Sequence, residues 1–144
     1  MSNIERAKEL YEQGFYCSQA VFAAFAEELG LTEKQALQIG SCFGGGMCKG
    51  EVCGACTGAL MVLGMKYGRY LSDDWESQQR VNNYTVRFLE KFSEENGSYI
   101  CNKLLGCDIA TPEGKIYARE HKLFSDLCPK MVGSAAKLAE ELIR

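Results

Sequence analysis

Residues 53–67 read CGACTGALMVLGMKY, and this stretch decides the fold. It carries no charged residue before Lys66, and Leu60, Met61 and Leu63 lie in a nearly unbroken apolar segment. Gly58 and Gly64 offer places where another helix can approach closely. The pattern predicts a central buried helix with the rest of the chain packed around it.

Helix signals recur on both sides of this stretch. Ser2 followed by Glu5 is a capping box, Gly30 and Gly97 are stop signals, and Pro129 suits the first position of a final helix. No β-type alternation, repeat or linker interrupts the series. We therefore predict an all-α fold, a compact single-domain bundle of six to eight helices that forms one domain over residues 1–144. The predicted helices cover residues 2–14, 17–29, 32–39, 53–67, 72–97, 101–105, 115–124 and 129–144.

Composition limits the class of function. The 144 residues are 47% hydrophobic and 24% charged, which suits a globular core, and the net charge of -3 argues against nucleic-acid or anionic-membrane partners. The longest uncharged apolar runs are far shorter than the roughly 20 residues that span a bilayer. The charged N-terminal segment lacks the apolar core of a secretory signal. We expect a soluble cytoplasmic protein without membrane insertion.

Cysteine is the unusual component, with eight in the chain. Cys17, Cys53, Cys101 and Cys128 each stand at or just before a predicted helix start. The helix macrodipole favours negative charge there, so we expect these thiols to have lowered pKa values and to be good nucleophiles and metal ligands. If the four helices converge, the four sulfurs would bind one cluster or exchange disulfides.

A second signal is the dense stretch that contains Cys48, Cys53 and Cys56. Four residues and then two separate the successive cysteines, as in plant-type ferredoxins, although the β-rich context of those proteins is missing. Cys53 and Cys56 alone form a C-x-x-C pair of the thiol-disulfide type, here without a βαβ context. The stretch favours either cluster ligation or dithiol chemistry on a different fold.

Zinc is a competing interpretation of the same thiols, because four thiolates satisfy its tetrahedral site. The chain lacks the second C-x-x-C pair of a zinc ribbon, and His121, the only histidine, lies in a charged stretch that indicates a solvated position. Gly44, Gly45 and Gly46 lack the lysine and hydroxyl residue of a phosphate loop, so they predict a tight turn.

The segment Cys53-Gly-Ala-Cys-Thr-Gly58, preceded by Phe43-Gly-Gly-Gly46, resembles the signature of the C-GCAxxG-C-C (CGAxxG motif) family of redox-active proteins. The segments that begin at Cys17, Cys101 and Cys128 resemble the family's other cysteine motifs, so the resemblance covers nearly the whole chain. It implies a small helical protein with redox or iron-sulfur chemistry. It also implies that the four characteristic cysteines are Cys17, Cys53, Cys101 and Cys128, the same set that the helix starts select.

Four further cysteines depart from the family pattern: Cys42, Cys48, Cys56 and Cys107. Cys48 and Cys56 flank Cys53 and are candidates for additional ligands or resolving thiols. Cys42 and Cys107 are as well explained by burial as by a role in the site.

Three functions remain open from the sequence. The first is an electron carrier whose helix-start thiolates hold an iron-sulfur cluster and which exchanges electrons with a redox partner protein. The second is a metal-free thiol-disulfide oxidoreductase that uses Cys53 and Cys56. The third is a zinc-stabilised structural adaptor. For a small helical protein with this much apolar surface, a homodimer is the default expectation.

Overall fold

The structure, a computed structural model, describes residues 1–144 and contains no strand. The all-α fold is confirmed, with nine α-helices. The ninth arises because the segment predicted at 115–124 is broken where Lys122 adopts a left-handed backbone with φ of 54°. The helices are α1 (Asn3–Glu12), α2 (Cys17–Ala24), α3 (Glu33–Gly40), α4 (Gly54–Tyr67), α5 (Trp75–Asn96), α6 (Cys101–Leu105), α7 (Pro112–Glu120), α8 (Leu123–Asp126) and α9 (Cys128–Ile143).

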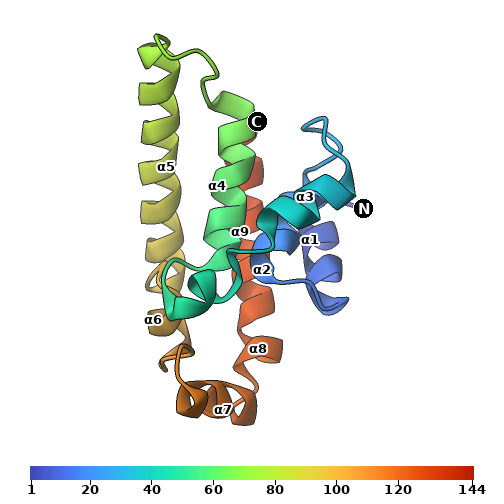
Figure 1. The fold of residues 1–144 in the computed structure, drawn as a ribbon, viewed down its shortest axis with the longest axis vertical. Coiled ribbons are helices and arrows are strands. Elements are labelled where there is room, and N and C mark those ends of the chain that lie inside the picture. Colours follow the sequence, from blue (N-terminus) through green and yellow to red (C-terminus); the bar gives the residue numbers. More distant parts are fainter.

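Helix α4 occupies the predicted central position, with α2, α5 and α9 packed around it (Figure 1). Gly58 allows the close approach of α2, because a Cβ there would lie 2.7 Å from the carbonyl oxygen of Ser18. The same expectation for Gly64 is wrong, since Gly64 is exposed and a Cβ there would meet nothing within 4 Å. The close packing is therefore confined to the N-terminal half of α4, near the cysteines.

Local signals set most helix ends. The capping box of Ser2 and Glu5 begins α1, and Gly97, with φ of 93°, ends α5. Asp74 caps α5 by accepting a hydrogen bond from the Ser77 amide, two residues after the predicted start at Ser72. Helix α2 ends at Ala24, earlier than predicted, and irregular turns lead from there to Gly30.

The helices form two hydrophobic cores of unequal size. The main core holds 25 buried residues, drawn chiefly from α1, α2, α4, α5 and α9. A small core of Cys101, Leu105, Ile109 and Ala118 lies at one end of the molecule, where α6, α7 and α8 gather (Figure 1). The candidate functional site lies at the boundary between the two cores.

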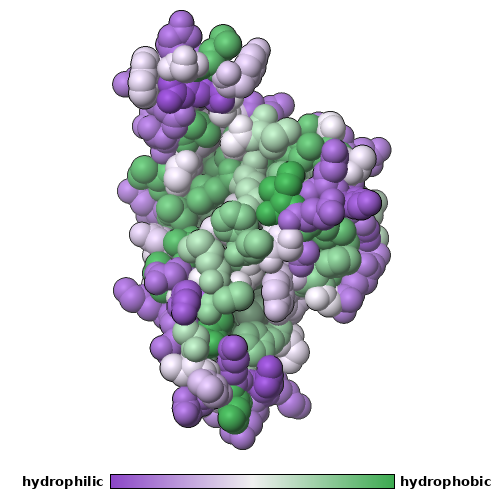
Figure 2. Space-filling model, in the orientation of Figure 1, coloured by the Kyte–Doolittle hydropathy of each residue, from purple (hydrophilic) through white to green (hydrophobic).

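Helix α4 is apolar on its outward side as well as on its buried side. Leu60 and Met61 are half-buried, and Met65 is 48% exposed. Figure 2 shows the resulting concentration of hydrophobic groups along the middle of this face, with hydrophilic groups around its margins. No helix combines the length and the apolar character that a membrane span needs.

Candidate functional site

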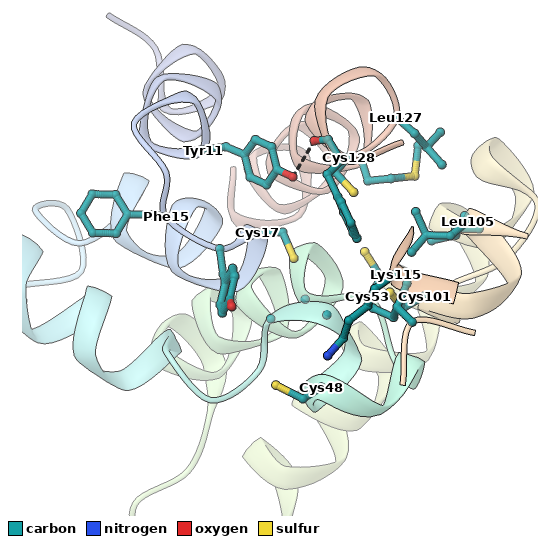
Figure 3. A pocket seen from close by; sticks show the side chains of 18 of the residues that line it. Tyr11, Phe15, Cys17, Cys48, Cys53, Cys101, Leu105, Lys115, Leu127 and Cys128 are labelled. Carbon is teal, nitrogen blue, oxygen red and sulfur yellow. Dashed lines mark hydrogen bonds between the residues drawn. The ribbon is translucent and has the colours of Figure 1, made fainter. Parts of the chain in front are cut away.

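A pocket of about 480 Å³ lies between the two cores. Its lining includes five cysteines, and we call it the thiol pocket. Cys53 is part of the main core and Cys17 packs against it. Cys101 is part of the small core and Cys128 packs against it. Each of these four begins or immediately precedes a different helix, so the structure brings the four helix-start cysteines together around one space (Figure 3). The lining cysteines are Cys17, Cys48, Cys53, Cys101 and Cys128.

A single antiparallel β-bridge holds the segments that carry Cys53 and Cys101 side by side. Val52 pairs with Ile100, the backbone amide of Cys53 donates to the Tyr99 carbonyl at 2.8 Å, and the amide of Cys101 donates to the Glu51 carbonyl at 2.6 Å. Cys53 and Cys101 thus each follow a bridge residue and precede or begin a helix. The bridge is too short for sequence periodicity to reveal it.

The sulfur of Cys17 fits into a space left by glycine. A Cβ on Gly54 would overlap the Cys17 Sγ atom, and the backbone of Phe43 and Gly44 closes the same space. The amides of Gly45 and Ser18 hydrogen-bond to the Cys17 sulfur. The glycine-rich loop therefore forms the tight turn that the sequence predicts, and it also supplies an amide donor to a site sulfur.

The loop continues into a left-handed turn, η1 (Gly46–Gly50), which carries Cys48 into the pocket wall. Four consecutive residues, from Gly45 to Cys48, have φ between 59° and 64°. Left-handed backbone costs about 1–2 kcal/mol for a residue with a Cβ, and Met47 and Cys48 both adopt it. Such local strain is typical of functional sites.

Tyr11 is a polar contact of the site that the sequence did not indicate. Its hydroxyl donates to the Phe124 carbonyl at 2.7 Å, the interaction drawn in Figure 3, and it lies beside the Cys128 thiol. This contact joins α1 of the main core to α8 and to the start of α9. Because both partners are distant in sequence, no local motif would reveal it.

The expected lowering of the thiol pKa values is wrong. A hydrogen bond to Cys53, together with burial, raises the pKa of Cys17 well above its usual range. The pKa of Cys53 is raised too: the hydrogen bond from Cys17 lowers it, but the hydrogen bond to Cys56 and burial outweigh that effect. Burial and neighbouring cysteines raise the pKa of Cys101 to about 12, and burial raises that of Cys128 to about 11. Crowding and burial outweigh the helix dipole, so the thiols are protonated at neutral pH.

The other residues that the sequence singled out lie outside the pocket lining. Cys56 is fully buried in the main core, one turn beyond Cys53, and does not line the pocket. Cys42 is exposed, and Cys107 is half-buried beside the small core. His121 is exposed, as predicted, and stacks on the ring of Tyr117.

The donor geometry distinguishes between kinds of metal centre. No three His, Cys, Asp or Glu side chains are arranged so that they could share one metal ion. A single tetrahedral zinc needs four donors at about 2.0–2.3 Å from one point, which is a closer convergence than the four thiols have as placed. In a four-iron cluster held by four cysteines each cysteine binds a different iron, which suits sulfurs spread around a pocket.

These observations define a class: a small all-α protein with a buried, multi-cysteine pocket at the junction of two cores. Over residues 15–142 the chain matches the family model described as putative redox-active protein (C_GCAxxG_C_C). The chain therefore belongs to this cysteine-rich redox-active family, and the resemblance drawn from the sequence is confirmed. No curated protein and no solved structure gives a match.

Proposed function

We propose that the thiol pocket is an electron-transfer centre in which Cys17, Cys53, Cys101 and Cys128 bind an iron-sulfur cluster. The observation that carries the proposal is that four cysteines, each at the N-terminus of a different helix, line one pocket. A bound cluster would supply reversible one-electron transfer. The electron partner would be another protein of the cytoplasm.

Three features of the chain support cluster binding. The N-terminal ends of α2, α4, α6 and α9 direct their positive dipole ends toward the negative charge of a thiolate-bound cluster. The amides of Gly45 and Ser18 hydrogen-bond to the Cys17 sulfur, and that of Ala55 to the Cys53 sulfur, contacts that tune reduction potential. Leu104, Leu105 and other apolar side chains of the lining limit the access of water.

The raised thiol pKa values are compatible with this role. Burial raises the pKa values of Cys101 and Cys128, so these thiols keep their protons at neutral pH, and iron would take the place of those protons. Cys101 and Cys128 would then release protons as they become ligands, so assembly would be favoured by rising pH. Cys48, which also lines the pocket, is the nearest candidate for an additional ligand.

The test is purification without oxygen, followed by an absorption spectrum with iron and sulfide analysis of the same sample. We expect visible charge-transfer bands, and we expect Cys17→Ser and Cys128→Ser to lower iron and sulfide per chain. Cys42→Ser is the matched control, because Cys42 is exposed and outside the pocket. A colourless protein that holds no iron, and that takes up none when supplied with ferrous iron and sulfide, would refute the proposal.

One observation favours a second candidate, thiol-disulfide exchange. The thiols of Cys17, Cys53 and Cys56 lie close enough to shift the pKa values of their neighbours, in a series that runs from the pocket into the core. In such a reaction Cys53 gives up its proton and the resulting thiolate attacks a substrate disulfide, and the released substrate thiol takes up the proton. Cys56 then attacks the Cys53 sulfur, which releases the second thiol and leaves a Cys53–Cys56 disulfide. Two electrons pass to the substrate, and an external dithiol reductant restores the pair.

Substitutions at the two ends of the pocket separate the candidates. Cys128→Ser removes a proposed cluster ligand but leaves Cys53 and Cys56 intact, so dithiol activity would survive while iron is lost. Cys56→Ala has the reverse effect, because Cys56 lies in the core and does not line the pocket. Mass spectrometry after mild oxidation would detect the Cys53–Cys56 disulfide, and its absence would exclude the second candidate.

A further inference from the structure

Two cations from α7 lie on the wall of the thiol pocket, where no carboxylate accompanies them. Lys115 and Arg119 are one helical turn apart, and both line the pocket. Their neighbours Gly114 and Ala118 are buried, so this side of α7 is turned toward the small core. Neither cation takes part in an ion pair, since the four ion pairs of the structure belong to Arg6 and Arg144.

The rest of the lining is apolar or aromatic. The pocket volume, about 480 Å³, lies within the roughly 300–1,000 Å³ of sites that bind small organic molecules. Such sites combine an apolar wall with a few polar groups that fix the orientation of the ligand. Figure 3 shows the side chain of Lys115 extending into the same space as the sulfurs. The aromatic residues of the wall are Tyr11, Phe15, Tyr16 and Phe124.

From these contacts we propose that the thiol pocket binds a small organic anion. Lys115 and Arg119 hold its carboxylate or sulfonate group, and the aromatic wall holds its apolar body, which places the anion beside the sulfurs. The lining contributes two positive charges and no carboxylate, so it favours an anionic group at this wall. The inference rests on the proposed function in one respect: the anion is taken to be a small-molecule partner of the sulfur centre.

Two naphthalene probes that share an apolar body isolate the contribution of the charge. 8-Anilinonaphthalene-1-sulfonate carries a sulfonate, and N-phenyl-1-naphthylamine is its uncharged counterpart. Fluorescence titration of the anaerobically purified protein should give one saturable sulfonate site per chain. Removing both cations, with Lys115→Gln and Arg119→Gln together, should weaken sulfonate binding about 2- to 30-fold, as expected for two exposed charge contacts. Binding of the uncharged probe should change by less than about twofold.

A matched control pair is present on α5. Arg87 and Lys91 are also exposed and one turn apart, but they do not line the pocket. Replacing both by glutamine removes the same two charges and should leave the affinity for the sulfonate unchanged. Exchanging the two pocket cations, with Lys115→Arg and Arg119→Lys, should retain most of the affinity. Helical circular dichroism of every variant shows that the fold is intact.

The reactivity of two exposed cysteines tests the location of the anion. Cys48 lines the pocket and Cys42 does not, although both are exposed. A saturating concentration of the sulfonate should slow the alkylation of Cys48 by iodoacetamide and leave that of Cys42 unchanged, as followed by mass spectrometry. Equal protection of both cysteines would place the probe outside the pocket and overturn the inference.

The outcomes of the two proposals are distinguishable. Equal weakening of sulfonate binding in the α5 and α7 double variants, or no weakening in either, overturns the anion site and leaves the iron analysis untouched. Failure to find iron overturns the cluster, whereas sulfonate binding that still depends on Lys115 and Arg119 sustains the anion site. The titration is therefore repeated on protein freed of metal by chelation, with its thiols reduced.

Discussion

The fit between Gly54 and Cys17 gives a prediction that can be worked out atom by atom. A methyl group at residue 54 would overlap the Cys17 Sγ atom and lie 3.1 Å from the carbonyl oxygen of Phe43 and 3.2 Å from the Cα of Gly44. The backbone neighbours can give way by only a few tenths of an ångström, so the sulfur must move. Overpacking of this kind costs about 1–3 kcal/mol of unfolding free energy.

Gly64→Ala supplies the matched control, because it makes the same chemical change on the same helix with nothing within 4 Å. It should stabilise the protein by about 1 kcal/mol through helix propensity. At about 2–4 °C per kcal/mol, the melting temperature should fall by about 2–12 °C for Gly54→Ala and rise by about 2–4 °C for Gly64→Ala. Thermal unfolding followed by circular dichroism measures both.

A double-mutant cycle with Cys17→Ala shows whether the sulfur is the cause. Without the Sγ atom the methyl at residue 54 has the space that it needs, so most of the cost of Gly54→Ala should disappear. The coupling energy between the two substitutions should be about 1–3 kcal/mol. If Gly54→Ala has the same effect with and without the Cys17 sulfur, the described packing of the sulfur against α4 is refuted.

Three further predictions concern the hydroxyl, the strained turn and the buried thiols. Tyr11→Phe should destabilise the protein by about 1 kcal/mol in urea unfolding, because it removes the hydrogen bond from the hydroxyl to the Phe124 carbonyl. Met47→Gly should stabilise the protein by about 1 kcal/mol, since glycine accepts the φ of 59° without strain, and a melting temperature below that of the parent would contradict this account. In the reduced, metal-free protein the raised thiol pKa values stabilise the folded state. This contribution is complete below about pH 8.5, the usual thiol pKa. It is lost as the pH rises through about 11 for Cys128 and about 12 for Cys101. Urea unfolding at a series of pH values should show this decline, and the Cys101→Ser/Cys128→Ser double variant should show a shallower one.

The sequence predicts the helices well because their boundaries depend on neighbouring residues. Ser2 with Glu5, the αL glycine at Gly97 and Pro129 each act within one turn of the chain, and the structure places helix ends at or next to them. The same local signals identify which cysteines begin helices. Gly64 shows the limit of this reasoning, because which side of α4 faces α2 depends on tertiary packing.

The site itself depends on contacts between distant parts of the chain. The bridge of Val52 with Ile100 and the contact of Tyr11 with Phe124 join segments that no periodicity connects. Lys115 appears from its sequence context to be an ordinary surface lysine of an amphipathic helix. The error in the direction of the thiol pKa values has the same origin, since a helix start is visible in the sequence but burial and crowding of thiols are not.

The position of the pocket links its chemistry to the stability of the fold. Cys17 and Cys53 stand on the side of the main core, and Cys101 and Cys128 on the side of the small core. In the thiol form, the β-bridge and the hydrogen bond from Tyr11 to Phe124 connect the two sides. A ligand that binds all four sulfurs adds a connection that exists only in the folded chain, so it stabilises the attachment of α6, α7 and α8 to the rest by its own binding free energy. A disulfide between Cys53 and Cys56 lies on one side and adds no such connection. Hydrogen exchange in α6 and α7 should therefore slow when the proposed cluster binds and stay unchanged when that disulfide forms. The exchange rates of these two helices thus distinguish cluster binding from dithiol chemistry.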